Sequence, residues 1–133
     1  MTSRSLASSR CAPEFDMVLR AASDYIVVAP HGELDLLTAP QLEAALTRAE
    51  HRAKLIVLDL RGLTFASAAG MKAVLDAHVR SQAADGTCLT LVLQHNGAVR
   101  HAFELAGLAD RLPFTPVMPG WALAAPATTP RAA

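Results

Sequence analysis

The 133-residue sequence has few of the residues that mark several large classes of protein. It holds only two cysteines, Cys11 and Cys88, which lie far apart and form no C-x-x-C pair. A disulfide framework is therefore not expected, and a reducing compartment fits this cysteine usage. The five histidines show neither H-x-H nor H-E-x-x-H spacing, so we predict no metal site and no bound cofactor.

Excess charge of one sign and long apolar runs are absent as well. The 12 basic residues balance 12 acidic ones, which argues against nucleic acid or an anionic membrane as a partner. No apolar run approaches the ~20 residues that span a bilayer, and the first residues lack the apolar stretch of a secretory signal. We therefore expect a cytoplasmic protein without a membrane partner.

Length and local composition predict one folded domain between two tails. A chain of this length is long enough for one core and too short for two ordinary domains. Residues 1–13 are rich in Ser, Arg and Ala without periodicity, and residues 119–133 are rich in Pro and Ala. We expect flexible tails at 1–13 and 119–133, the second with a short helical piece at 121–125, around a domain at 14–118.

Hydrophobic patterns predict several strands within this domain. Residues 15–20 and 25–31 favour the two short strands of a hairpin. Residues 54–60 are nearly continuously apolar, which is typical of a central strand covered on both faces. Residues 87–93 favour another strand, and residues 111–114 favour a last short one.

Three helices are predicted between these strands. The first starts at Thr38, which has capping-box spacing to Gln41. Its predicted inner face consists of Leu42, Leu46 and Ala49. The second follows Ser67, and its predicted apolar face consists of Met71, Val74, Leu75, His78 and Val79. The third is capped by Asn96 and closed by Gly107.

The element order therefore reads β-β-α-β-α-β-α-β. Helical crossovers between strands imply mostly parallel pairing, right-handed connections and helices packed on the sheet. We predict an α/β fold with a mixed sheet of four or five strands and helices packed on it.

The turn Ser67-Ala68-Ala69-Gly70 joins the central strand to the second helix, where many α/β proteins place a phosphate, a nucleophile or a partner. A serine nucleophile on a sharp elbow needs glycines two residues to either side, but Phe65 and Ala69 occupy those positions. The turn has one glycine and matches neither nucleotide-binding glycine pattern. We therefore predict that Ser67 caps the helix and that the protein is not an enzyme.

Asp35 is the second candidate, in the loop between the second strand and the first helix. A lone carboxylate in a loop usually forms a turn or faces solvent. It gains functional interest only if the fold places it beside residues 67–71.

Three blocks of sequence together resemble the STAS domain of bacterial anti-sigma factor antagonists. They are Gly32-Glu33-Leu34-Asp35, then Asp59-Leu60 with Phe65 and Gly70, then Leu105-Ala106-Gly107-Leu108, and the resemblance runs from about residue 15 to residue 117. It implies a regulator that binds rather than catalyses. In that family, the unphosphorylated antagonist binds an anti-sigma factor with a histidine-kinase-type ATP-binding fold and so frees a sigma factor. The same partner can phosphorylate a serine at the start of the second helix, and the antagonist is then released.

The family pattern at this turn, Asp-Ser-Ser-Gly-Leu, is degenerate in this chain. Ser67 stands at the Asp position, Ala68 at the phospho-acceptor, Ala69 at the next serine, and Gly70 and Met71 follow. An alanine cannot accept a phosphate, so the resemblance implies no phosphorylation at the usual position. The resemblance also implies a partner-binding surface made of Asp35 and residues 67–71.

Ser67 and Thr64 carry the nearest hydroxyl groups. A kinase built for the neighbouring position would have to shift by one residue, which turns a side chain by about 100° around a helix. We therefore regard Ser67 as a weaker candidate for phosphorylation and expect it to stay largely unmodified.

Three functions remain open at this point. In the first, the domain binds a kinase-type anti-sigma factor and has lost its off-switch. In the second, the surface has drifted, and the domain is a sensor or scaffold that holds a small ligand or another STAS protein. The third is a small enzyme, for which the sequence offers only isolated Ser, His and Asp residues.

Overall fold

The computed structural model describes residues 15–122, in which one sheet is backed by helices. The predicted tail at 1–13, Cys11 and residues 123–133 lie outside the described residues. The predicted α/β class with a mixed sheet is confirmed. The sheet has six strands, however, and the predicted number of four or five is wrong.

The sheet is built around the long strand β3 (Tyr25–Leu34), which pairs with three other strands. The hairpin strand β2 (Asp16–Ala21) runs antiparallel to it, whereas β4 (Leu55–Asp59) runs parallel along its first half. Beyond β4 follow β6 (Cys88–Val92) and the short β7 (Phe114–Thr115), both parallel.

The strand that the sequence did not predict is β5 (Leu63–Ala66), which pairs in parallel with the second half of β3. Its outer residues are buried and its two central residues are exposed, so it lacks the alternation that marks a strand in a sequence. The pairing also shifts register between Gly32 and Glu33. The sequence pattern therefore predicted a turn for this segment. In the structure it is a strand that runs alongside the end of β3.

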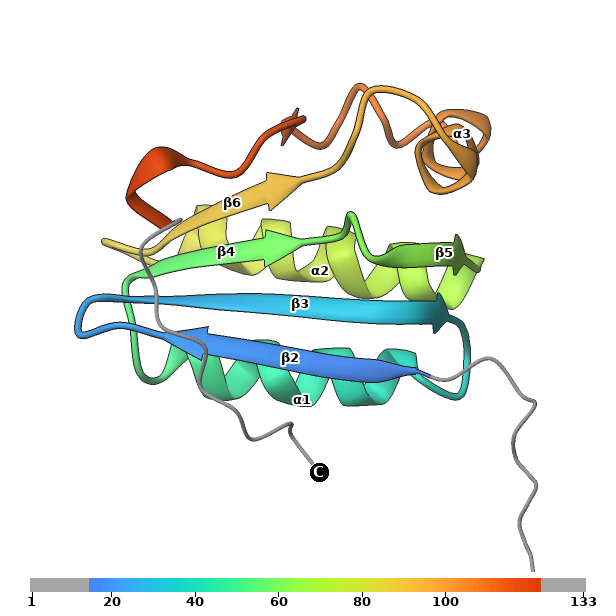
Figure 1. Cartoon of the computed structure of the whole chain (residues 1–133). Coiled ribbons are helices and arrows are strands. Elements are labelled where there is room, and N and C mark those ends of the chain that lie inside the picture. The colour runs from blue at the N-terminus through green and yellow to red at the C-terminus, as the bar shows by residue number, and fades with distance from the viewer. Residues whose placement is uncertain (1–14, 123–133) are drawn as a thin grey trace, which may run out of the picture.

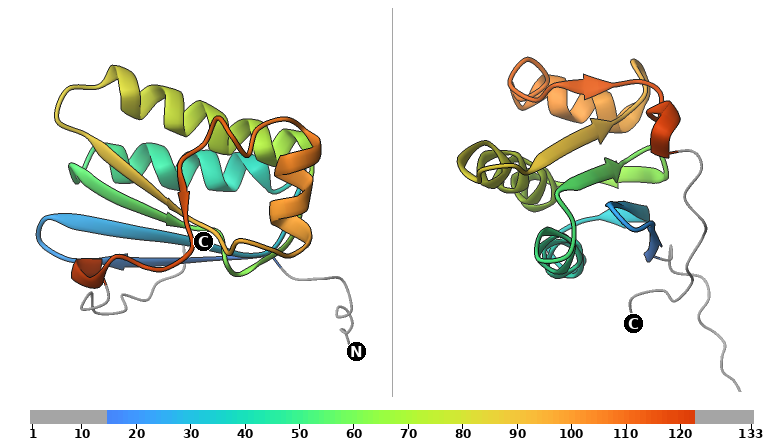
Figure 2. Two further views of the ribbon diagram at one scale, coloured as in Figure 1. Left: turned by 90° about the horizontal axis from the view of Figure 1, so that it is seen from above. Right: turned by 90° about the vertical axis from the view of Figure 1, so that its left-hand side faces the viewer.

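Two long helices cover one face of the sheet, as Figures 1 and 2 show. They are α1 (Ala39–Glu50) and α2 (Ala68–Ala83), and the short helix α3 (Ala98–Leu105) lies at the end of the sheet where β5 ends. The predicted inner face of α1 is confirmed, because Leu42, Leu46 and Ala49 are all buried.

The predicted ends and faces of the helices needed three corrections. Thr38 precedes α1 but makes no side-chain bond to the helix, so the predicted capping box with Gln41 is wrong. Gly97, not Asn96, precedes α3. On α2, Val79 is 56% exposed, because the buried face of the helix is turned toward the alanines at 73 and 77 and away from Val79. Its buried residues are Gly70, Met71, Ala73, Val74 and Ala77.

The end of α3 follows the prediction. Gly107 has a φ of 75°, the left-handed conformation that glycine adopts without strain. The next amide, from Leu108, donates to the carbonyl of Phe103 at 2.9 Å. Leu108 in turn packs against the core, as expected for the apolar contact that accompanies such a helix end.

The second face of the sheet carries its own small core. Tyr25, Val27, Val57 and Val92 are buried there beneath Met118 and Ala122. Ala122 belongs to a 3₁₀ turn, η1 (Gly120–Ala122), that lies on the face opposite the helices (Figure 2). Packing therefore continues past residue 118, where the sequence suggested the end of the domain.

Candidate functional site

Three chain segments meet where β3 and β5 end and α2 begins. Leu34 is the register partner of Ala66, so the ends of the two strands lie side by side. The next amide, from Ser67, donates to the carbonyl oxygen of Leu34 at 2.8 Å. Asp35 follows Leu34 directly, so the fold places it next to the start of α2, as the candidate surface required.

Gly70 allows α2 to approach β3 this closely. A Cβ atom added at Gly70 would lie 2.7 Å from both the carbonyl oxygen and Cγ of Leu34. Real Cβ contacts are never this short, so any side chain would push the helix away from the strand. Position 70 therefore requires a glycine, because only a residue without a side chain lets α2 pack this closely against β3.

Ser67 is the N-cap of α2, as predicted. Its backbone is extended, with φ −84° and ψ 176°, and its Oγ accepts the amide of Gly70 at 3.3 Å. The hydroxyl thus satisfies an amide of the first helical turn that has no partner within the helix.

Asp35 and Thr38 form a reciprocal pair just before α1. The Asp35 carboxylate accepts the amide of Thr38 at 3.0 Å, and the hydroxyl of Thr38 accepts the amide of Asp35 at 2.8 Å. The amide of Leu37 donates to the same carboxylate oxygen at 3.0 Å. This pair has the geometry of a capping box, three residues earlier than the sequence pattern suggested.

The hydrogen bonds also change the acidity of Asp35. The backbone amide of Thr38 makes the largest contribution, and the Thr38 hydroxyl and the Leu37 amide add to it. Together they outweigh partial desolvation and lower the pKa of Asp35 below its ordinary value. Asp35 is therefore a fixed negative charge at the edge of the surface.

The predicted site residues differ in how far they reach solvent. Ala68 is exposed, and Ser67 and Ala69 are half-buried. Gly70 is buried, and Met71 is 9% exposed and belongs to the main core. A partner can therefore touch Ala68 directly, whereas Gly70 and Met71 set the position of the helix beneath it.

Three large apolar side chains at this end of the sheet were missed by the sequence reasoning. Leu36 and Leu37 follow Asp35 and are 74% and 82% exposed. Phe65, in β5, is 48% exposed and is the register partner of Glu33. The signal was present in the consecutive leucines of a short loop, which is an unusual place for exposed leucine.

Asp59, from the second sequence block, stabilises the turn that leads into β5. Its carboxylate is bound by Arg61 at 2.9 Å and 3.0 Å through two guanidinium nitrogens, and by the amide of Arg61. Hydrogen bonding to Asp59 raises the pKa of Arg61 above its ordinary value. This ion pair is therefore a structural element of the turn.

Neither metal ligands nor a membrane helix are found in the described part of the chain. Between residues 15 and 122, no three His, Cys, Asp or Glu side chains gather closely enough to hold an ion. Within the same range, no helix has the length and apolar character needed to cross a bilayer.

Comparison with known proteins identifies the family. The sequence matches the STAS domain over residues 16–119. The chain belongs to the STAS domain family. The resemblance carried by the three sequence blocks is thereby confirmed, and the matched range covers β2 to β7. No curated protein sequence matches this STAS domain closely enough to add a relative.

Solved structures share the fold of this STAS domain. An anti-sigma factor antagonist from Mycobacterium paratuberculosis is 24% identical, with a TM-score of 0.69 over 79% of this chain and 88% of that one. The antagonist SpoIIAA of Bacillus in its unphosphorylated form is 23% identical, with a TM-score of 0.54 over 78% and 88%. A sulfate transporter family protein from Wolinella succinogenes is 22% identical, with a TM-score of 0.54 over 66% and 74%.

Proposed function

We propose that this STAS domain is a regulatory binding module that acts as an anti-sigma factor antagonist. Its partner is an anti-sigma factor with a histidine-kinase-type ATP-binding fold, and binding releases a sigma factor. The observation that carries the proposal is the close seating of α2 on Leu34 through Gly70, which presents Ala68 beside Asp35. Solved antagonists of the same fold support this choice among the functions of STAS domains.

The binding surface combines a fixed charge with exposed apolar side chains. Asp35 supplies the charge, and Leu36 and Leu37 supply apolar area that a partner can remove from water. Burial of a leucine side chain contributes about 1.5–3 kcal/mol, so these two residues can act as anchors of an interface.

The chain lacks the phosphorylation switch of its family at the usual position. Ala68 is exposed but carries only a methyl group, and the hydroxyl of Ser67 is bound to the amide of Gly70. A phosphate would add about two negative charges to the docking surface. Without an acceptor, the domain stays in its binding form.

The test is a binding measurement with the kinase-type anti-sigma factors of the source cell. Purified domain and each anti-sigma factor are mixed with and without ATP, and affinity is measured by calorimetry. We expect one partner to bind equally well under both conditions, and mass spectrometry to find no phosphate on Ser67. Failure to bind any kinase-type anti-sigma factor contradicts the proposal, and stoichiometric phosphate on Ser67 contradicts the missing switch.

Two alanine variants separate a surface effect from a general effect of charge. In Ala68→Asp the new carboxylate lies on the proposed surface, whereas in Ala44→Asp it lies on the exposed side of α1. We expect Ala68→Asp to weaken binding at least tenfold and Ala44→Asp to leave it unchanged. Equal affinities for the two variants would place the interface elsewhere.

A sensor or scaffold role is the alternative, and the missing carboxylate at position 67 favours it. Ser67 stands where the family pattern has Asp, so the charge of this surface differs from that of the family. In this role the domain holds a small ligand or pairs with another STAS protein. A ligand-free native mass spectrum and a monomeric sedimentation profile contradict it.

A further inference from the structure

A groove lies at the end of the molecule opposite the proposed partner surface. It has a volume of about 430 Å³ and runs between the last turns of α1 and the β2–β3 hairpin. This volume falls within the range of about 300–1,000 Å³ that is typical of small-molecule sites. The proposed anti-sigma factor surface uses none of the residues that line it.

The floor of the groove is apolar. Ala45 and Ala49 line it from α1, and Leu19 and Ile26 line it from the hairpin. Ala45, Ala49 and Ile26 are only 1%, 3% and 8% exposed and form a closed floor, so the apolar surface open to an occupant belongs to the half-buried Leu19 and to the aliphatic stems of the arginines at the rim. An occupant therefore meets the Leu19 side chain on the hairpin side and arginine methylenes on the α1 side.

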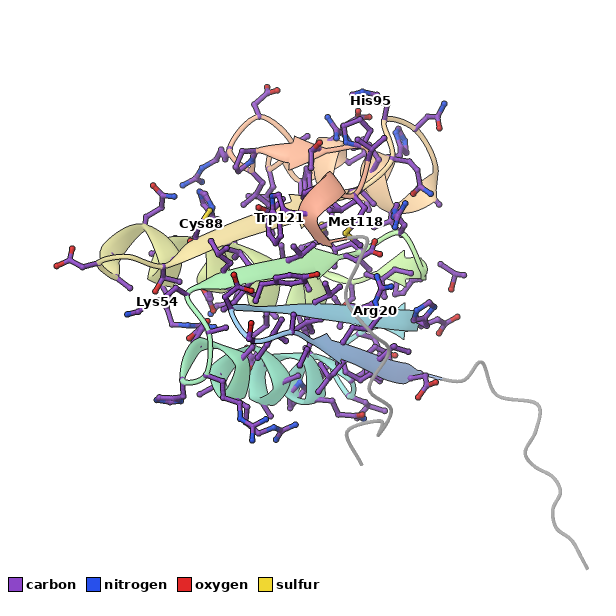
Figure 3. The ribbon with its side chains drawn as sticks, turned by 60° about the vertical axis from the view of Figure 1, so that its left-hand side comes forward. Arg20, Lys54, Cys88, His95, Met118 and Trp121 are labelled. Carbon is purple, nitrogen blue, oxygen red and sulfur yellow. The ribbon has the colours of Figure 1, made fainter. Side chains whose placement is uncertain are left out.

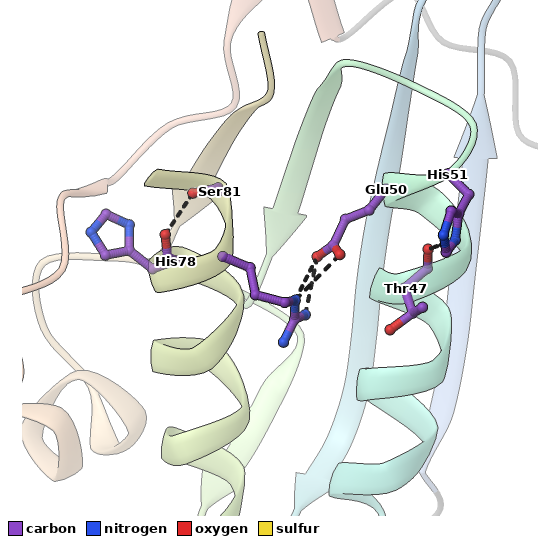
Figure 4. Close-up of polar contacts among 6 residues, drawn as sticks. Thr47, Glu50, His51, His78 and Ser81 are labelled. Carbon is purple, nitrogen blue, oxygen red and sulfur yellow. Dashed lines mark hydrogen bonds and ion pairs between the residues drawn. The ribbon is translucent and has the colours of Figure 1, made fainter. Parts of the chain in front are cut away.

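The rim of the groove is basic. Arg48, His51 and Arg52 line it, and all three are exposed. Within residues 15–122, the side chains of Arg48 and Arg52 take part in no ion pair or hydrogen bond. His51 is held by a contact of 2.9 Å between its Nδ1 and the carbonyl of Thr47, which fixes the position of the ring (Figure 4).

Nearby carboxylates do not neutralise this rim. Glu50 lies between the two arginines in sequence, but it points toward α2, where Arg80 binds it at 3.0 Å (Figure 4). Residues two positions apart on a helix do not face each other, so Glu50 cannot serve Arg48 or Arg52 at the same time. Asp24, in the hairpin turn, forms no ion pair with either arginine.

We propose that this groove binds a small anionic amphiphile, specifically a free medium-chain carboxylate. The aliphatic chain lies between α1 and the hairpin, and the carboxylate is held at the rim by Arg48 and Arg52. Arginine suits this role because its planar guanidinium binds both oxygens of a carboxylate at once. The proposal is independent of the anti-sigma factor role, since it concerns the opposite end of the fold.

The probe for the test is decanoate, added to the full ¹⁵N-labelled chain below its micelle concentration. We expect saturable amide shifts in the second half of α1 and in the hairpin. Affinity should rise by about an order of magnitude from octanoate to decanoate, since each buried methylene strengthens binding. Uncharged decanol should bind at least tenfold more weakly, because it cannot pair with the arginines.

Arginine variants locate the head group. We expect Arg48→Gln and Arg52→Gln to weaken decanoate binding several-fold each, and about tenfold when combined. Arg20→Gln is the matched control, because Arg20 follows Leu19 in β2 and so points to the other face of the sheet (Figure 3). Replacing Arg48 or Arg52 breaks no ion pair within residues 15–122, so we expect these variants to fold. Thermal unfolding checks this for each variant.

Three results overturn the proposal. They are equal affinity for decanol and decanoate, amide shifts centred outside α1 and the hairpin, and equal losses in the rim variants and in Arg20→Gln. The absence of any saturable shift with decanoate and dodecanoate overturns it as well. Unchanged anti-sigma factor binding in these variants distinguishes this groove from the surface around Ala68.

Discussion

At the scale of single residues, the surface around Ala68 is defined by hydrogen bonds that hold two polar side chains in place. Ser67 is bound to the amide of Gly70, and Asp35 is bound to the amides of Leu37 and Thr38. Both side chains satisfy amides at the beginning of helical turns, which have no partner within the helix. Their first role is therefore to hold the surface in shape.

Removing the cap of α2 should cost stability. We expect Ser67→Ala to lower the free energy of unfolding by about 1 kcal/mol, since the amide of Gly70 loses its acceptor. Urea unfolding measures the change, and Ser67→Asp, which keeps an acceptor, should recover most of it. Ser81→Ala is the control, because the Ser81 hydroxyl donates to a helix carbonyl and caps no amide. If Ser67→Ala and Ser81→Ala lower the free energy of unfolding equally, the capping role is contradicted.

Asp35 should make stability depend on pH in a defined direction. Its pKa is lowered in the folded state, so the charged form contributes stability above the unfolded value near pH 4, and this is lost as pH falls through the folded pKa. Thermal unfolding should therefore show Asp35→Asn to be less stable than the parent at pH 7, with a gap that narrows as the pH falls below about 4. A gap of constant size from pH 7 down through the acid range would mean that charge is not the cause.

At the scale of elements, the central strands, the inner face of α1 and the cap of α2 at Ser67 were predictable, whereas β5 and the caps of α1 and α3 were not. Leu42, Leu46 and Ala49 repeat at helical spacing, and the core confirms them. Val79 fits the same spacing but is exposed, because periodicity does not reveal which side of an alanine-rich helix rests on a sheet. The capping pair of Asp35 and Thr38 was not predicted either, because no sequence pattern indicated that a turn begins at Asp35.

The contact between α2 and β3 should not tolerate a side chain at Gly70. We expect Gly70→Ala to destabilise the domain by about 2 kcal/mol, since its Cβ would overlap the carbonyl of Leu34. Gly120→Ala is the matched control, because nothing lies within 4 Å of a Cβ at that position and its φ is not in the left-handed region. Equal stability of the two variants by urea unfolding would show that α2 can shift without cost.

At the scale of the whole molecule, the sequence predicted one α/β domain, but it did not predict how far the packed chain extends. The Pro- and Ala-rich composition of residues 119–133 suggested a boundary before them. The chain nevertheless crosses the second face of the sheet, where Met118 and Ala122 are buried. Only the three-dimensional arrangement shows that this face needs a cover. The candidate site could not be predicted from the sequence alone either. Residues 35 and 67 lie far apart in the chain, and the pairing of β3 with β5 brings them together.

The second core should depend on Met118. We expect Met118→Ala to lower the free energy of unfolding by about 2 kcal/mol, because it uncovers Val27, Val57 and Val92. The neighbouring Val117 is 64% exposed, so Val117→Ala should change stability by less than about 0.5 kcal/mol. Urea unfolding of both variants tests this, and similar values for the two would mean that the segment does not cover the sheet.

The same segment places the chain's single tryptophan where spectroscopy can follow it. Trp121 meets Tyr25 edge to face, with ring centroids 5.1 Å apart. Its fluorescence therefore reports on the attachment of the C-terminal segment to the sheet. A change in emission before global unfolding marks release of this segment from the sheet. An unchanged emission during partner binding means that binding at the other end of β3 leaves this segment in place.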